Sequence, residues 1–295
     1  MNKARPLIVL SAVIPLLLSG CGGAGTTATV PPVPAPLLPT PTPTPHATTS
    51  ARVSDVLPKD GATVGVAQPL VVTFAEPVKD RKTAQAALQV TSTPPITGAW
   101  YWIDSTHVDY RPQQFWPAGT HVTLDAHAGG SDRTSSFTIG RNQVLAVNTK
   151  KHTLRVLRDG ATVKSYDVST GKPGWETRNG TEVLMDKVGE KHWTNQQIDA
   201  PEHYSLHSQY AIRITDSGEF VHDAPWSTGT IGDANTSHGC IGLRTKDMKW
   251  IWDNSLLGDP VVVTGSDKDS QAVYNRFDDW NIPWSTWSAG NADTT

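Results

Sequence analysis

The sequence has little cysteine and little charge, and each shortage excludes a class of protein. Its 295 residues include only two cysteines, too few for a disulfide scaffold or a four-thiolate zinc site. The 25 Lys and Arg against 28 Asp and Glu leave a net charge of −3, without the basic field that nucleic-acid binding needs. We therefore expect no nucleic-acid partner. The length predicts about two domains.

The N-terminus has the layout of a secretory signal. Lys3 and Arg5 precede an apolar run at residues 7–18, which is too short for a stable membrane span. The ending Leu18-Ser19-Gly20-Cys21 resembles the lipobox of bacterial lipoproteins, in which the peptide is cut before a lipidated cysteine. The resemblance implies a signal peptide at 1–20, a lipid on Cys21 and attachment to the outer face of a membrane. An ordinary signal with an incidental cysteine is the alternative.

Residues 21–50 are predicted to be a linker. They are rich in Pro, Thr, Ala and Gly and nearly free of charge and aromatic side chains, so they cannot bury enough apolar surface to order themselves. The Thr-Pro alternation favours an extended polyproline II stalk, at about 3.1 Å per residue. This segment also explains part of the low charged fraction of 18%.

Residues 51–140 have the pattern of short strands separated by turns. Trp100 and Trp102 alternate with their neighbours, as do Val108 and Tyr110, and turn-forming residues lie between the two runs. Further strands are predicted at 70–74, 121–126 and 136–139. Regular short strands without a helical period predict an immunoglobulin-like β-sandwich. We expect Trp100 and Trp102 to serve a core or domain contact, with a glycan platform as the alternative.

Residues 141–265 are predicted to form a second, β-rich domain, so the fold class is mainly β. Strands are expected at 144–148, 154–157, 163–168 and 260–263, with Asp159-Gly160 as a hairpin turn. One helix is predicted, with Thr245 as its N-cap and Gly258 just past its end. Its apolar positions are Met248, Ile251, Trp252 and Leu256.

The segment Ser237-His238-Gly239-Cys240 carries the candidate chemistry. A thiol is a nucleophile only as a thiolate, so it needs a neighbouring base or cation, and His222 and His238 are close in sequence. The surrounding glycines would let main-chain amides turn toward a bound carbonyl. The spacing leaves two alternatives, a buried structural cysteine and a zinc site made by His222, His238 and Cys240.

A wider stretch resembles a known family. The sequence SGEFVHDAPW at 217–226, followed by NTSHGC at 235–240, is similar to the active-site signature of the L,D-transpeptidases with a YkuD-type domain. Residues 110–120 resemble the immunoglobulin-like domain of actinobacterial members, and 279–287 resemble their C-terminal extension. The resemblance covers nearly all of 51–290. It implies an immunoglobulin-like domain at 51–140, a catalytic domain at 141–265 and a Trp-rich extension at 266–295.

The resemblance implies acyl transfer between peptidoglycan stem peptides, without metal or cofactor. Cys240 would attack the carbonyl of the third residue of a tetrapeptide stem, D-Ala would leave, and an amine of a second stem would resolve the thioester into a 3→3 cross-link. His222 would be the base, and Asp223 would orient its ring through a main-chain carbonyl. Backbone amides of 238–240, which include His238 and Gly239, would form the oxyanion hole.

The same resemblance implies further contacts and leaves alternatives. Tyr204, Ser217 and Gly218 match positions that touch the donor stem, and carbapenems would be covalent inhibitors. The family usually has Asn or Arg two residues after the cysteine, where this chain has Gly242, which puts stem affinity or acceptor choice in question. A carboxypeptidase that uses water as the acceptor, and a wall-binding module with a decayed site, are the alternatives.

Overall fold

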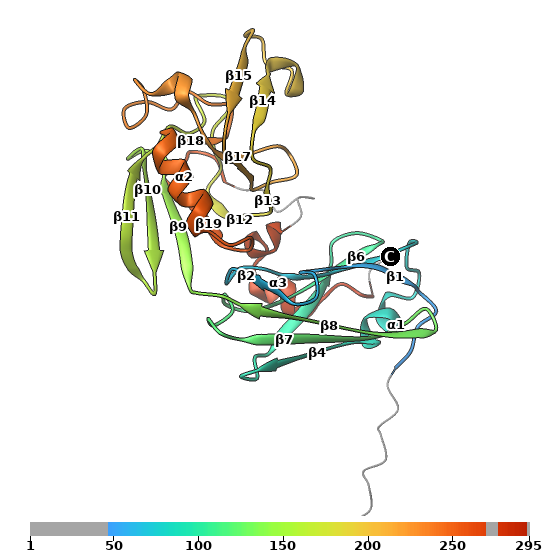
Figure 1. Cartoon of the computed structure of the whole chain (residues 1–295). Helices are drawn as coiled ribbons and strands as arrows, with labels where there is room; N and C mark the ends of the chain where they lie inside the picture. The colour runs from blue at the N-terminus through green and yellow to red at the C-terminus, as the bar shows by residue number, and fades with distance from the viewer. Residues whose placement is uncertain (1–46, 270–276, 294–295) are drawn as a thin grey trace, which may run out of the picture. The chain divides into compact units, whose positions relative to one another are not determined.

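The computed structural model describes residues 47–269 and 277–293 (Figure 1). The predicted signal peptide, Cys21 and most of the predicted linker lie outside the described residues, as does part of the predicted extension. Within this described part, no helix is long and apolar enough to cross a membrane. Strands dominate the described elements, which confirms the predicted mainly β fold class.

The first domain is a sandwich of two 4-stranded sheets, with strand orders β1-β3-β6-β5 and β2-β8-β7-β4 (Figure 1). Side chains from both sheets, among them Phe74, Trp102 and Phe137, share one buried core. Along β7, buried and more exposed residues alternate, so one face of the strand meets this core. The predicted immunoglobulin-like sandwich is confirmed. The bounds are β1 Val53–Leu57, β2 Ala62–Val64, β3 Leu70–Phe74, α1 Arg81–Ala86, β4 Leu88–Thr93, β5 Gly98–Trp102, β6 His107–Pro112, β7 His121–Ala128 and β8 Ser131–Ile139.

The alternating aromatic residues lie on a pair of neighbouring strands, as predicted. Strands β5 and β6 pair antiparallel, with Trp100 opposite Tyr110. Trp102 is only 2% exposed and stacks on Phe74, with ring centroids 5.6 Å apart. Trp102 is therefore a core residue of the sandwich, and this burial excludes it from a glycan platform.

The second domain contains a 5-stranded sheet, β11-β10-β9-β19-β12, and a 4-stranded sheet, β13-β16-β17-β18, with a separate β14–β15 hairpin (Figure 1). Helix α2 contributes Met248 and Ile251 to a core that both sheets share. The bounds are β9 Gln143–Asn148, β10 Thr153–Arg158, β11 Ala161–Asp167, β12 Gly180–Val183, β13 Asp186–Lys187, β14 Lys191–Thr194, β15 Ser205–Ser208, β16 Ala211–Arg213, β17 Phe220–Asp223, β18 Ile241–Leu243, α2 Thr245–Asn254 and β19 Pro260–Thr264. Short 3-10 helices cover Asn195–Gln197, Pro225–Ser227 and Asp278–Asn281, and α3 covers Trp284–Ala289.

The predicted start of α2 is wrong by one residue. Thr245 is the first helical residue, and Arg244 occupies the N-cap position without a capping side-chain hydrogen bond. The reason is tertiary, because the Thr245 hydroxyl donates to Oδ2 of Asp223 at 3.0 Å. This hydroxyl therefore links the helix to β17, the strand that carries His222.

The predicted end of α2 is also too late. The helix stops at Asn254, before Leu256 and Gly258. The Leu256 amide instead donates to Oδ2 of Asp259 at 3.0 Å, which holds the chain in a turn ahead of β19. Gly258 has a positive φ of 90°, as expected of a glycine at a turn, although it does not directly follow the helix.

The Trp-rich extension packs around a buried arginine of the first domain. Arg111 is 2% exposed and donates to the main-chain carbonyls of Asp279 and Ile282, at 2.9 and 2.8 Å. Its guanidinium lies over the rings of Trp280 and Trp287, 4.7 and 4.4 Å from their centroids. These contacts favour packing over glycan stacking as the role of the tail.

The extension also bonds to main-chain groups of both domains. The indole nitrogen of Trp280 donates to the Ala67 carbonyl at 2.8 Å, and the Thr181 amide donates to the side chain of Asn281 at 2.8 Å. At the edge strand β5, Asn291 pairs with the amide and the carbonyl of Trp102, both at 2.7 Å. The extension is thus an integral part of the fold.

Candidate active site

A cavity of about 570 Å³ brings together most of the predicted site residues. It is lined by Cys240, His222, Tyr204, Ser217, Gly218 and His238. Asp223 and Gly239 lie behind this wall and contact lining residues through the main chain. The sequence separates Tyr204 from Cys240 by thirty-six positions, so the sheet and the hairpin are what assemble the site.

Strand pairing places the thiol and the imidazole on one face. Strands β17 and β18 run parallel, with His222 opposite Gly242. Cys240 comes two residues before Gly242, so it lies on the same side of the sheet as His222. A Cβ atom at position 242 would lie 3.2 Å from Cβ of Ala224 and 3.9 Å from Cε1 of His222. Glycine at this position therefore leaves the imidazole room beside the strand.

The hydroxyl of Ser237 fixes the backbone of residues 237–240, here called the cysteine loop. The Ser237 Oγ donates to the Cys240 carbonyl at 2.6 Å and accepts from the Gly239 amide at 3.2 Å. Gly239 has a φ of 111°, a conformation that favours glycine, and its carbonyl accepts from Thr177 Oγ1 at 2.7 Å. Ser237 therefore supports the loop.

The loop leaves two main-chain donors near the sulfur. Within the described residues, the amides of His238 and Cys240 have no hydrogen-bond acceptor, whereas the Gly239 amide is committed to Ser237. Free amides beside a nucleophile are what an oxyanion hole requires. His238 and Cys240 are consequently better candidates than Gly239 for holding a developing negative charge.

The Cys240 thiol is strongly held in its protonated form. Burial raises the pKa of the Cys240 thiol to about 12, and the nearby Glu219 carboxyl adds to the rise. The Phe220 amide and the cations of Lys191 and Arg213 oppose it. The sulfur lies 3.9 Å from the Gly218 carbonyl oxygen, to which its hydrogen points. Attack on a carbonyl therefore needs a base to remove the proton.

His222 is a neutral imidazole with a fixed tautomer. It is 4% exposed, and burial lowers the pKa of its ring below the usual value. Its Nδ1–H donates to the main-chain carbonyl of Asp223 at 2.8 Å, which leaves Nε2 as the acceptor. The ring lies between Trp193 and Trp226, with centroids 4.7 and 5.7 Å away. No direct bond joins it to the Cys240 sulfur among the contacts of the described residues.

The Asp223 side chain has a role that sequence reasoning missed. Its carboxylate is fully buried, and Oδ1 accepts from the amides of Gln209 and Tyr210, each at 2.9 Å. Its Oδ2 accepts from Thr245. The residue that orients His222 through its carbonyl is therefore itself held by three donors, from the turn before β16 and from α2. No short-range sequence pattern reveals this network.

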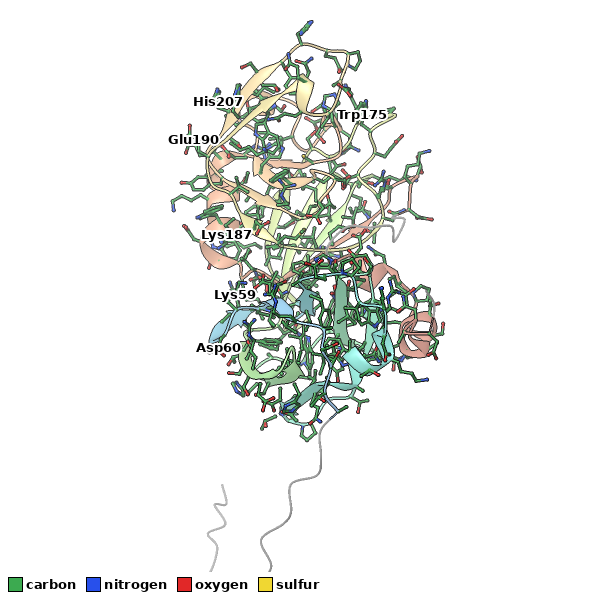
Figure 2. The ribbon with its side chains drawn as sticks, turned by 90° about the vertical axis from the view of Figure 1, so that its right-hand side faces the viewer. Lys59, Asp60, Trp175, Lys187, Glu190 and His207 are labelled. Atoms are coloured by element: carbon green, nitrogen blue, oxygen red, sulfur yellow. The ribbon has the colours of Figure 1, made fainter. Side chains whose placement is uncertain are left out.

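Aromatic and charged groups surround His238. Tyr204 stacks on the His238 ring with centroids 5.5 Å apart, and Trp175, labelled in Figure 2, meets it edge-on at 5.0 Å. Nε2 of His238 lies 3.2 Å from Oε2 of Glu202, which is also paired with Lys172. These partners lower the pKa of the Glu202 carboxyl to about 2. His238 is thus occupied by its neighbours and is a poor candidate for the base.

Sequence reasoning also missed lining residues from β14 and β16. Lys191 and Trp193 lie two positions apart on β14, and Arg213 ends β16. Alternation on a strand predicts that Lys191 and Trp193 share a face, but nothing in the sequence indicates that this face meets β16. Figure 2 labels His207 of β15, whose ring stacks on His192 of β14 at 4.3 Å.

The zinc alternative does not fit the geometry. Among residues 47–269 and 277–293, no three His, Cys, Asp or Glu side chains are placed to hold a metal ion. The arrangement instead combines a thiol, a neutral base and free amide donors, which suits acyl transfer through a covalent intermediate.

Comparison with known proteins identifies both domains. Residues 142–263 match the model of the L,D-transpeptidase catalytic domain, YkuD, and residues 40–132 match a bacterial immunoglobulin domain. L,D-transpeptidase 2 of Mycobacterium tuberculosis is 36% identical over 80% of this chain and 62% of its own length. The chain thus spans about three fifths of that relative.

Two further relatives are matched over most of their length. L,D-transpeptidase 1 of M. tuberculosis is 35% identical over 72% of this chain and 85% of its own length. The crystal structure of L,D-transpeptidase 3 of M. tuberculosis with a faropenem-derived adduct superposes with a TM-score of 0.64 at 35% identity, covering 72% of this chain and 98% of that one. The chain therefore belongs to the family of L,D-transpeptidases with a YkuD-type catalytic domain, preceded here by a bacterial immunoglobulin-like domain.

Proposed function

We propose that the chain is a peptidoglycan L,D-transpeptidase that forms 3→3 cross-links through a thioester on Cys240. The observation that carries the proposal is the presence, in one cavity, of a half-buried thiol and a neutral imidazole whose Nε2 is left as an acceptor. Neither group alone explains acyl transfer, because the thiol has its pKa raised to about 12 and cannot ionise unaided near neutral pH. Family membership supplies the reaction class.

The first half of the reaction acylates the enzyme. Nε2 of His222 takes the thiol proton as the sulfur attacks the carbonyl of the third residue of a tetrapeptide stem, forming a C–S bond. The amides of His238 and Cys240 receive the negative charge on the carbonyl oxygen. When the intermediate collapses, the C–N bond breaks, the imidazolium returns its proton to the leaving amine, and D-Ala departs.

The second half transfers the acyl group. A side-chain amine of an acceptor stem attacks the thioester and gives its proton to Nε2 of His222. The C–S bond then breaks, and the sulfur leaves as a thiolate that recovers the proton from the imidazolium. The Asp223 carbonyl, 2.8 Å from Nδ1, stabilises the imidazolium in both halves.

Water in place of the acceptor amine would give the alternative, an L,D-carboxypeptidase. The two activities share every step up to the thioester, so they differ only in what the open side of the cavity admits. A wall-binding module with a decayed site is disfavoured because the chain retains Cys240, His222 and the intact cysteine loop.

The N-terminal features complete the proposal. A lipid on Cys21 and the Pro-rich linker would hold the enzyme at the outer face of the cytoplasmic membrane and let it reach stem peptides in the wall. The support is the lipobox-like sequence and the linker composition. Because a relative has been captured with a faropenem-derived adduct, we also propose that penems and carbapenems acylate Cys240.

Two measurements test the proposal. Intact-mass analysis after incubation with imipenem should show one covalent adduct on the wild type and none on Cys240→Ala. Incubation with purified disaccharide tetrapeptides should release D-Ala and give 3→3 dimers. Tripeptide without dimer would move the assignment to carboxypeptidase, and an adduct that persists on Cys240→Ala would exclude Cys240 as the nucleophile.

A further inference from the structure

Two cations line the active-site cavity without forming an ion pair to any acidic side chain of residues 47–269 or 277–293. Lys191 of β14 and Arg213 of β16 lie against the same ring, that of Phe220, with their charged groups 5.0 and 4.6 Å from its centroid. Lys191 also lies 4.8 Å from the centroid of Trp193. The aromatic rings therefore hold two long, flexible side chains in place beside the thiol.

Neither cation is neutralised. Within the described residues neither forms an ion pair, and Arg213 spends only one donor, Nη1 to the Thr215 carbonyl at 3.2 Å. The other cation of this cavity, Lys172, is paired with Glu202. The Arg213 guanidinium and the Lys191 ammonium are half-buried and, in the part of the chain that the structure describes, have no carboxylate partner. Because charges removed from water are normally paired, we expect an anionic group of a ligand to complete this site.

The field of these cations reaches the reacting sulfur. Both lower the pKa of the Cys240 thiol against the larger effect of burial. Lys191 and Arg213 also line the same cavity as Cys240, so a substrate bound there for attack by the thiol meets both cations. A guanidinium with free donors and a neighbouring ammonium match a carboxylate, which accepts two donors from arginine and a point charge from lysine.

We infer that Lys191 and Arg213 bind a carboxylate of the donor stem next to the scissile amide, and so select stems in which that carboxylate is free over stems in which it is a carboxamide. The inference rests on the proposed transpeptidase function. Two carboxylates of a stem have this chemistry, the C-terminal one of D-Ala and the side-chain one of the diamino acid.

The test compares three synthetic tetrapeptide donors in steady-state release of the C-terminal residue. One has both carboxylates free, one has the diamino-acid carboxylate amidated, and one has a C-terminal amide. We expect the donor that lacks the recognised carboxylate to have a KM roughly 10- to 100-fold higher, the size expected for a lost charge-assisted hydrogen bond. The donor that suffers this loss identifies the source.

The matched variants are Arg213→Gln and Lys191→Met, with Lys246→Met as a control that removes an exposed cation from α2, outside the cavity. The ratio of kcat/KM for free and amidated donors, measured within one variant, cancels any change in thiol reactivity. We expect this ratio to fall toward one in Arg213→Gln, to fall partly in Lys191→Met, to be retained in Lys246→Met and to recover partly in Arg213→Lys.

The failure of this inference can be distinguished from failure of the proposed function. If wild-type enzyme releases D-Ala but treats all three donors alike, the carboxylate site is overturned while the transpeptidase assignment stands. If no donor reacts, calorimetric binding of the same peptides to Cys240→Ala protein decides. A preference for the free carboxylate that Arg213→Gln removes would support the pair, and equal binding of all three would reject it.

Discussion

Asp223 and Thr245 are joined by a 3.0 Å hydrogen bond between a buried carboxylate oxygen and a hydroxyl, which connects the strand of His222, the proposed base, to the first residue of α2. The same carboxylate accepts from the amides of Gln209 and Tyr210. Asp223 therefore has two separable roles, a main-chain role in orienting His222 and a side-chain role in joining three segments.

Shortening the Asp223 side chain tests this separation. Asp223→Ala keeps the carbonyl that bonds Nδ1 of His222 but leaves the partly buried amides of Gln209 and Tyr210 without this acceptor. We expect a loss of about 3 kcal/mol in the free energy of unfolding, against about 1 kcal/mol for Thr245→Val, which removes one hydrogen bond. Denaturant unfolding measures both. Equal losses in the two variants would contradict the proposed bridge.

The acylation rate should depend on pH through His222. Burial lowers the pKa of its ring below the usual value of about 6.5, and the base acts only when neutral. Activity should therefore be lost as pH falls through a pKa below 6.5 and remain level above it. Stopped-flow acylation by imipenem between pH 4.5 and 9 measures this.

A His222→Gln variant provides the complementary test. Without the base, acylation must wait for spontaneous ionisation of a thiol whose pKa is raised to about 12. We expect a rate roughly 10²- to 10⁴-fold lower at pH 7, rising with pH up to the limit of protein stability. A rate in this variant that stays flat between pH 7 and 10 would show that thiol ionisation does not limit it.

Glu219 should slow ionisation of the thiol. Its Oε1 lies 3.1 Å from where a Cβ of Gly239 would be, and its carboxyl adds to the raised pKa of Cys240. Burial also raises the pKa of Glu219 itself. Glu219→Gln removes the negative charge with little change in shape, so we expect the thiol pKa to fall and alkylation by neutral iodoacetamide at pH 8 to accelerate several-fold.

Glu176→Gln is a suitable control for that measurement, because Glu176 bonds to the Gly174 amide and is absent from the cavity lining. Its alkylation rate should match that of the wild type. Slower alkylation of Glu219→Gln would mean that the carboxyl helps to hold the loop around Gly239 more than its charge opposes the thiolate.

The docking of the C-terminal extension should weaken as pH rises. Asp109 of β6 and Asp279 are both buried, and burial raises the pKa of both carboxyls. Repulsion by Asp279 adds to the rise at Asp109. Asp278 and Asp104 add further repulsion, while Arg111 opposes it at Asp279. Protons bound to these carboxyls are then part of the folded state well above the pH at which an exposed Asp ionises.

The direction in which stability changes with pH follows from the number of protons that the folded and unfolded chains bind. An unfolded Asp has a pKa of about 3.9, so above this pH the folded chain binds more protons than the unfolded chain, and stability falls as pH rises. We expect Tm to decline from pH 5 toward pH 8 in the wild type and to decline less in Asp109→Asn. The control Asp125→Asn, which changes a half-buried carboxylate that accepts from Thr134 outside this cluster, should retain the wild-type slope.

How far the sequence predicts the structure depends on the range of the interactions. Strand β9 was predictable because buried and half-buried residues alternate along it, and β3 because it is a short apolar run that is buried at four of its five positions. The start of α2 was not, because Thr245 bonds to Asp223, 22 positions away, instead of to its own helix. A local capping preference therefore fails as a predictor where the side chain forms its hydrogen bond with a residue distant in sequence.

The same distinction applies to the site. The cysteine loop and His222 were identified from a compact motif and its resemblance to a family, and one cavity contains both. The pairing of Lys191 with Arg213 around Phe220 could not be read from the sequence, because it depends on which strands of two separate sheets face each other. The role of such charged residues can be inferred only once the structure shows which side chains surround them.

Asn291 closes an edge that would otherwise be open. Strand β5 is the last strand of its sheet, and outward-facing main-chain groups on such a strand are a template for a strand from another molecule. The Asn291 amide occupies the N–H and C=O of Trp102, and the Trp287 indole occupies the carbonyl of Ala99. The C-terminal tail therefore covers part of this edge, and removing it should leave the main-chain groups of β5 open to pairing with a second molecule.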